Sequence, residues 1–187
     1  MREYTFARCL FCKTGKEEFV ARGIEESGHG RALFPQRMKK FRKGQSWEER
    51  LTTLLPGYVF VYSDEELVRF TGFPSAQHII RVLKYGNGGD ALVGRDREFA
   101  DWLWRLEGRV GVMRALQEGD RVEIIDGVFK QLRGRITRMD RRRKTVRVEL
   151  DTQGAIRHIW LSYEIVDRVD AERLPVAGDE GARGLEA

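Results

Sequence analysis

The chain has 187 residues, of which 41% are hydrophobic and 34% are charged, so it can bury a core and global disorder is excluded. The net charge of +5 and the pI of about 9.4 permit a polyanionic partner without requiring one. Two cysteines are too few for a disulfide-scaffolded secreted protein, and neither a membrane-length apolar run nor a hydrophobic leader is visible, so we expect a cytoplasmic protein.

The N-terminal residues predict a strand followed by a helix. Residues 4–12 are rich in aromatic and apolar side chains, which favour a strand. Thr14 and Glu17 have the spacing of a capping box, so we expect a helix to start near Gly15. Gly28 would end this helix, because glycine readily adopts the conformation that follows a helix C-terminus.

The next segments predict a hairpin and then a buried strand. Residues 31–55 carry many bases and predict a partly exposed β-hairpin, with Gly44-Gln45 as its turn. Residues 58–62 alternate between valines and aromatic residues, so both faces of that segment are apolar. Such a strand belongs in the centre of a sheet, covered on both sides.

Two further helices and a strand complete a first domain, to which we assign residues 1–108. The fold class predicted for it is α+β, a sandwich of helices on an antiparallel sheet. Ser63 and Glu66 again have capping-box spacing and predict a short helix. Residues 78–85 favour a strand, and Asp96 is placed to cap the last helix. The buried stripe of that helix is predicted to be Phe99, Trp102, Leu103 and Leu106.

The second half of the chain has a different pattern. Residues 109–117 are expected to form a linker, 118–169 a small five-stranded β-barrel, and 170–187 a disordered tail. Turn residues separate short apolar runs, as a small barrel requires. The five strand-like runs are residues 121–125, 132–139, 145–150, 156–161 and 165–169.

No motif supports an enzyme or a metal site. Cys9 and Cys12 stand alone, whereas a zinc site needs further ligands. Because positions three apart in a strand point to opposite faces, we expect two ordinary buried thiols. The three histidines are scattered, and phosphate-binding glycine loops are missing. We therefore expect no catalytic residues, no metal and no cofactor.

Two basic segments are candidates for contact with a polyanion. In residues 31–50 seven bases accompany two acids, and we favour contact with nucleic acid over a merely solvated hairpin. Residues 130–147 carry nine bases and the single acid Asp140. Here a phosphate-binding surface and a charged, solvated turn over 141–144 stay equally open.

Several apolar side chains exceed what the core of so small a sandwich needs. They could form a surface pocket for a partner helix or loop, or they could extend the core, and we favour the pocket. The residues concerned are Phe11, Leu55, Pro56, Tyr58, Phe60 and Tyr85.

Two motifs resemble the NusG family of transcription elongation factors. Residues 55–61, Leu-Pro-Gly-Tyr-Val-Phe-Val, are similar to the N-terminal NGN domain of that family. Residues 118–136, with a Gly-Asp pair, a Gly-Val-Phe turn and Gly134, are similar to the KOW motif of its SH3-like barrel. The match runs from about residue 4 to 168 in order and spacing. The Cys-Lys-Thr-Gly sequence at 12–15 is closest to the specialised LoaP-like and RfaH-like paralogues.

The resemblance implies a monomeric factor that binds RNA polymerase and has no active site. Its first domain would hold the clamp helices of the largest polymerase subunit in an apolar pocket. Contact with the opposite jaw, the gate loop, would keep the clamp closed on nucleic acid and disfavour the paused state. The pocket residues would be Phe11, Leu55, Pro56, Tyr58 and Tyr85, and the gate-loop residues would be Arg69, Phe70 and Thr71.

The resemblance also implies further partners. Phe129 in the KOW turn would contact ribosomal protein S10 or Rho. Residues 151–157 lack the stretch that the family ties to Rho, so the likeness favours an antitermination factor that reads an RNA hairpin or the non-template DNA strand. A general pausing and termination factor, or a KOW-containing protein that binds RNA or the ribosome, is the alternative. The nucleic-acid contacts would be Lys13, Arg37, Lys39, Lys40, Arg42 and Lys43.

Overall fold

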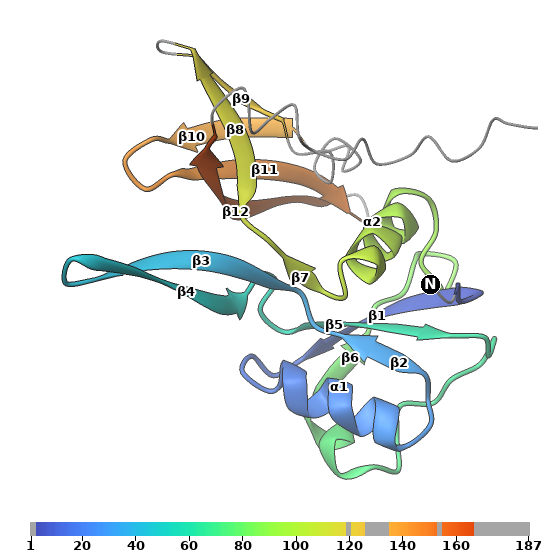
Figure 1. Ribbon diagram of the computed structural model, residues 1–187. Helices are drawn as coiled ribbons and strands as arrows, with labels where there is room; N and C mark the ends of the chain where they lie inside the picture. Colours follow the sequence, from blue (N-terminus) through green and yellow to red (C-terminus); the bar gives the residue numbers. More distant parts are fainter. Residues whose placement is uncertain (1–2, 119–120, 126–134, 153–154, 167–187) are drawn as a thin grey trace, which may run out of the picture.

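The computed structural model describes residues 3–118, 121–125, 135–152 and 155–166 (Figure 1). These residues form a mixed α/β fold with two α-helices, one short 3-10 helix and three sheets. The predicted coarse class, α+β, is therefore confirmed. The expected tail at 170–187 and Phe129 lie outside the described residues.

The N-terminal sheet is antiparallel, and its strand order is β2-β5-β1-β6. Helix α1 covers one face of this sheet and helix α2 covers the other, as Figure 1 shows. Strand β5 lies inside the sheet with every residue after Tyr58 buried, which confirms the predicted central strand. The elements are β1 (Phe6–Cys12), α1 (Glu17–Glu26), β2 (Arg31–Leu33), β5 (Tyr58–Ser63), β6 (Ile79–Val82) and α2 (Gly94–Arg105).

Side-chain alternation along β5 divides the core between the two helices. Val61 belongs to the apolar cluster beneath α1. Phe60 lies on the opposite face, with its ring centroid 5.8 Å from that of Phe99 in α2. The Tyr62 hydroxyl donates a hydrogen bond of 2.7 Å to the carbonyl oxygen of Ala100. Phe60 is thus a core residue and not part of a surface pocket.

The two cysteines follow the same alternation along β1. Cys9 packs in the cluster on the α2 side, and Cys12 packs in the cluster on the α1 side. Their predicted orientation to opposite faces is confirmed. Burial, with a smaller contribution from Glu17, raises the pKa of Cys12 to about 11.

The basic hairpin forms over residues 36–53, within the predicted range of 31–55, whereas Arg31–Leu33 pair with β5 in the N-terminal sheet instead. Strand β3 (Gln36–Lys43) pairs with β4 (Ser46–Thr53) through the turn at Gly44, whose φ of +61° lies in the region that favours glycine. The other edge of β3 pairs in parallel with the short strand β7 (Arg109–Val110). This three-stranded sheet extends away from the N-terminal sheet in Figure 1.

The described C-terminal residues form a five-stranded sheet of order β10-β11-β12-β8-β9. Residues 109–117, expected to be a linker, contain β7 and nearly all of β8. The expected break between the strand-like runs at 156–161 and 165–169 is wrong, because β12 runs on through residues 162–164 and exchanges β11 for β8 as its partner there. The strands are β8 (Met113–Glu118), β9 (Arg121–Ile124), β10 (Arg135–Asp140), β11 (Thr145–Thr152) and β12 (Ala155–Ile165).

The capping box predicted for α1 is wrong. The residue before the helix is Lys16, and no side chain caps it. Glu17 instead is buried and accepts a hydrogen bond of 2.7 Å from the backbone N–H of Gly57. The glutamate therefore links α1 to a loop forty residues away. The end of the helix is as predicted, since Gly28 follows it with φ +77°.

The predictions between 63 and 96 are wrong in two places. No helix forms over 67–70; a 3-10 helix follows at Pro74–His78 and leads into β6. Asp96 lies inside the first turn of α2 and not at its N-cap, which is Val93. In the predicted apolar stripe of α2, Phe99, Trp102 and Leu103 are buried and Leu106 is partly buried.

None of the helices in the described part of the chain is both long enough and apolar enough to span a membrane.

The turn after α1 provides a test of this packing. At Gly30, with φ +123°, an added Cβ would lie 2.4 Å from the carbonyl oxygen of Tyr62. Gly28 also has a positive φ, but a Cβ there would meet nothing within 4 Å. We expect Gly28→Ala to lower the free energy of unfolding by about 1 kcal/mol through backbone strain, and Gly30→Ala by about 3 kcal/mol. Urea unfolding curves measure both, and equal losses would contradict the close packing at residue 30.

Candidate functional site

Two aromatic rings lie side by side at one end of the N-terminal sheet. Phe11 of β1 is directly opposite Tyr58 of β5, and their ring centroids are 5.3 Å apart. Both side chains are only partly buried. The guanidinium of Arg81 on β6 lies 5.8 Å from the centroid of the Phe11 ring. A partly exposed aromatic surface with a cation beside it is suited to a protein partner.

The loop before β5 is fixed against this aromatic pair. Gly57 has φ +84°, and a Cβ there would lie 2.7 Å from an edge atom of the Phe11 ring. Its carbonyl oxygen accepts from the Cys12 N–H at 2.7 Å, and its own N–H donates to Glu17. The preceding Pro56 is exposed. The loop that carries the exposed Pro56 is therefore anchored on two sides, with Gly57 against the Phe11 ring.

Tyr85 is the remaining aromatic residue predicted for the pocket. It is partly buried, and its hydroxyl donates to Asp96 at 2.7 Å and accepts from the Val93 N–H at 3.2 Å. Burial is the main reason that the pKa of Tyr85 rises to about 12, and the hydrogen bond to Asp96 adds to it. The phenol is thus held by the first turn of α2. Leu55, like Tyr58, packs at the margin of the core on the α2 side.

The segment predicted to touch the gate loop is divided between core and surface. Phe70 is buried in the cluster beneath α1, with its ring centroid 6.3 Å from that of His29. Its ring is consequently part of the core. Arg69 and Thr71, on either side of it, are exposed and available to a partner.

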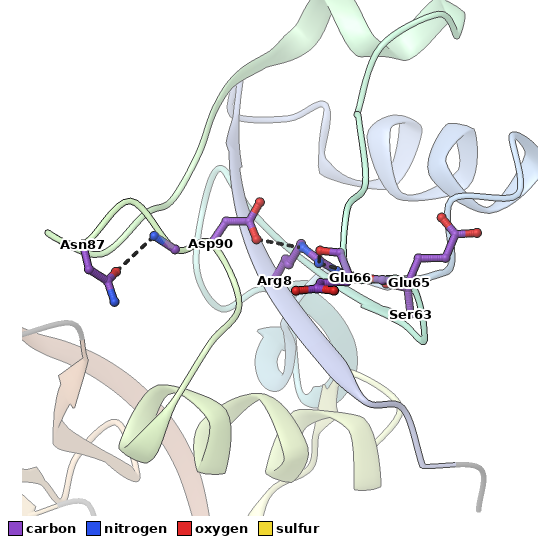
Figure 2. A network of polar contacts seen from close by, with 7 residues as sticks. Arg8, Ser63, Glu65, Glu66, Asn87 and Asp90 are labelled. Atoms are coloured by element: carbon purple, nitrogen blue, oxygen red, sulfur yellow. Dashed lines mark hydrogen bonds and ion pairs between the residues drawn. The ribbon is translucent and has the colours of Figure 1, made fainter.

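Arg8 organises the loops at the opposite end of β1 (Figure 2). Its side chain is 1% exposed, and its Nε forms an ion pair of 3.0 Å with Asp90. One terminal nitrogen donates to Ser63 Oγ at 3.0 Å, and the other donates to the carbonyl oxygens of Glu65, at 3.1 Å, and Glu66. The segments that carry Arg69 and Tyr85 are thereby tied to the same strand.

The predicted nucleic-acid residues do not all share one environment. Lys13 is exposed in the turn after β1, where its N–H donates to His78. The others lie on β3, where Lys39 is 5.0 Å from the centroid of the Phe41 ring. Arg42 is exposed, and Lys43 is exposed although it pairs with Glu48 at 2.8 Å.

Two of the predicted bases face the C-terminal sheet instead of solvent. A terminal nitrogen of Arg37 donates to the carbonyl oxygen of Trp160 in β12, and burial lowers the pKa of this guanidinium. The Lys40 ammonium is 3.0 Å from Glu164 and 3.5 Å from Glu49. These contacts, led by the hydrogen bond to Glu164, raise the pKa of Lys40. Both residues therefore join β3 to β12.

Three residues that organise this region escaped the sequence reasoning. Arg8 was overlooked and Glu17 was assigned to a local helix cap because their partners lie about forty or more positions away, and Glu164 was overlooked because its partner lies still farther away in sequence. For Arg8 a signal did exist, since a single arginine inside an apolar strand must find buried partners. For the two glutamates the local sequence offers no comparable signal.

Comparison with known proteins places these features in a family context. The family model described as "Transcription termination factor nusG" matches residues 8–101, about half of the chain and most of the N-terminal sheet. Among solved structures, the chain is similar to one described as "Domain interaction in Thermotoga maritima NusG", with 22% identity and a TM-score of 0.48. That similarity covers 84% of this chain and 93% of the other. No curated protein matches the chain.

The Arg8 network provides a test of how the loops are held. Arg8→Met should lower the free energy of unfolding by about 3 kcal/mol, because it leaves the buried Ser63 hydroxyl, two partly buried carbonyl groups and Asp90 without their donor. Asp90→Asn should cost only about 1 kcal/mol, since the Asp90 side chain is 30% exposed. Chemical unfolding followed by circular dichroism measures both values. An Arg8→Met protein as stable as the wild type would show that the network does not hold the loops.

Proposed function

Because the chain belongs to the NusG family of transcription factors, we propose that it is a transcription elongation and antitermination factor with no catalytic step of its own. Residues 1–108 act as an NGN domain that binds RNA polymerase. Residues 118–169 act as a KOW barrel that recruits a second partner. The factor promotes processive readthrough while it stays bound to the polymerase.

The observation that carries this proposal is the Phe11–Tyr58 pair beside the anchored loop of Pro56 and Gly57. Rings that are already fixed lose little conformational entropy when they bind, so they make strong anchors in an interface. A helix is a suitable occupant, because its apolar stripe can lie against a shallow aromatic surface. We assign this surface to the clamp helices of the largest polymerase subunit.

The exposed Arg69 and Thr71 support a second contact, with the gate loop on the opposite jaw. A factor that touches both jaws binds the closed clamp more tightly than the open clamp. Its binding therefore shifts the population toward the closed, transcribing state without any chemical step.

Nucleic-acid recognition is the third element of the proposal. The remaining predicted bases of β3, Lys39, Arg42 and Lys43, bind an RNA hairpin or non-template DNA. Phosphate oxygens pair with such side chains independently of base sequence. Arg37 and Lys40 are reassigned to the junction with β12, because their head groups are occupied there.

The two alternative functions predict different results in binding experiments. A general pausing and termination factor would bind polymerase and also Rho. A KOW-containing protein of the ribosome or of RNA would not bind polymerase. Capture of the purified enzyme by the tagged chain, with ribosomal protein S10 and Rho offered in parallel, separates the three.

Tyr58 gives the sharpest test of the polymerase contact. Tyr58→Ala should weaken binding to RNA polymerase at least fivefold, or about 1 kcal/mol, because it removes half of the aromatic pair. Phe19→Ala, which removes an exposed ring from α1 on the other side of the sheet, should leave the affinity unchanged. Biolayer interferometry with immobilised polymerase measures both, after thermal melts have shown that the variants are folded. Unchanged affinity in Tyr58→Ala would remove the aromatic pair from the interface.

The hairpin has a test of its own. Replacing Lys39 and Arg42 together with Gln should weaken binding of a single-stranded oligonucleotide. It should also reduce the slope of log affinity against log salt by roughly 0.7 for each phosphate that the variant no longer neutralises. Fluorescence anisotropy from 50 to about 200 mM salt gives that slope. A slope equal to that of the wild type would place the nucleic-acid site elsewhere.

A further inference from the structure

The second basic segment forms an exposed turn between β10 and β11. Its residues 141–144 are all exposed, and the Arg143 side chain is 82% exposed. Local backbone contacts hold the turn: the Asp140 carboxylate accepts from the Arg143 N–H at 2.9 Å, and the Lys144 N–H donates to Arg141 at 3.4 Å. Arg143 Nε also lies 3.9 Å from the Asp140 carboxylate, so this side chain adds one contact to the turn while most of its surface stays exposed.

This turn and the β3–β4 hairpin meet through two consecutive residues of β12. The Tyr163 N–H donates to the carbonyl oxygen of Lys144 at 2.9 Å, and the next residue, Glu164, pairs with Lys40 at 3.0 Å. Strand β12 thus contacts the 141–144 turn through its backbone and the middle of β3 through a side-chain ion pair. Two basic elements that are far apart in sequence are adjacent in space.

The direction of β12 places both turns at the same end. Arg37 contacts Trp160 and Lys40 contacts Glu164, so β12 passes β3 in the same chain direction. The C-terminal end of β12 and the tip of the β3–β4 hairpin therefore lie toward the same side of the molecule. Figure 1 shows the β3–β4 tip and the β10–β11 turn projecting on the same side of the molecule.

Like charges oppose each other on both hairpins. Lys39 is directly across from Arg50 on β4, and Arg138 is directly across from Arg147 on β11. Such cross-strand pairs reduce stability, and an anion bound beside them relieves the repulsion. The carboxylate at the junction, Glu164, shares the Lys40 ammonium with Glu49, so its charge is partly balanced there.

We propose that the β3–β4 hairpin and the 141–144 turn form one continuous binding surface for the sugar-phosphate backbone of a single nucleic-acid strand. The strand runs from Lys39 and Arg42 on the N-terminal side to Arg142 and Arg143 on the C-terminal side. The inference rests on the nucleic-acid role proposed above and extends it to the C-terminal sheet. Recognition is through phosphate, so RNA and single-stranded DNA offer the same chemistry.

The experiment uses the full-length chain and two matched double variants, Lys39→Gln/Arg42→Gln on the hairpin and Arg142→Gln/Arg143→Gln on the turn. A control, Arg22→Gln/Arg31→Gln, removes the same charge from exposed positions around α1. Labelled oligonucleotides of about 20 residues, long enough to cover several phosphate sites, are titrated as DNA and as RNA of one sequence by fluorescence anisotropy across a salt series. The stoichiometry is measured at saturating protein.

One continuous surface predicts one oligonucleotide per chain and a loss of affinity of about tenfold or more in each double variant. Each variant should also lower the salt slope by roughly 1.4, at about 0.7 for each of the two phosphates that it no longer neutralises, while the control changes neither quantity. A weakened hairpin variant beside a turn variant identical to the control would overturn the continuous surface and leave the hairpin role intact. No binding of either oligonucleotide by the wild type would overturn both proposals. If only one of the two oligonucleotides binds and both double variants weaken it, the surface is supported and its ligand is identified as RNA or as DNA.

Discussion

The buried guanidinium of Arg8 is the interaction on which the N-terminal architecture depends. It lies in the middle of a strand whose other residues are mostly apolar, and it binds the loop after β5 and the loop after β6 at once. A buried charge is costly unless all its donors find partners, so both loops are held close to β1. The irregular segments that bear Arg69 and Tyr85 owe their positions to this requirement.

Where alternation or helical spacing determines an element, its position and buried face could be predicted from the sequence. The central strand at 58–62, the basic hairpin around Gly44 and the buried stripe of α2 all depend on patterns that repeat within one element. The two capping-box predictions failed for a common reason. Glu17 and Ser63 had suitable spacing for a local cap, but each is used by a partner far along the chain, Gly57 and Arg8 respectively. Local spacing cannot reveal such competition.

In the candidate site, too, local patterns predicted some residues correctly, whereas distant contacts decided the position of others. Phe11 and Tyr58 come together because β1 and β5 pair in a register that agrees with the alternation of their side chains. Phe70 turned inward, although its neighbours in sequence are polar and exposed. Arg37 and Lys40 could not be distinguished from the other bases of β3 by sequence, because only the approach of β12 sets them apart. The number of charges in a segment can be counted from the sequence, whereas the exposure of each charged side chain depends on which other elements pack against it.

The turn at Gly57 has a consequence for how this surface can vary among related chains. A Cβ at that position would lie 2.7 Å from the ring of Phe11 and 3.0 Å from the carbonyl oxygen of Cys12, so the ring cannot keep its place if the glycine is replaced. A related protein with a larger residue at position 57 would need a smaller residue at position 11, and it would therefore lack the aromatic pair. We therefore expect an aromatic residue at position 11 only in related chains that keep a glycine at position 57.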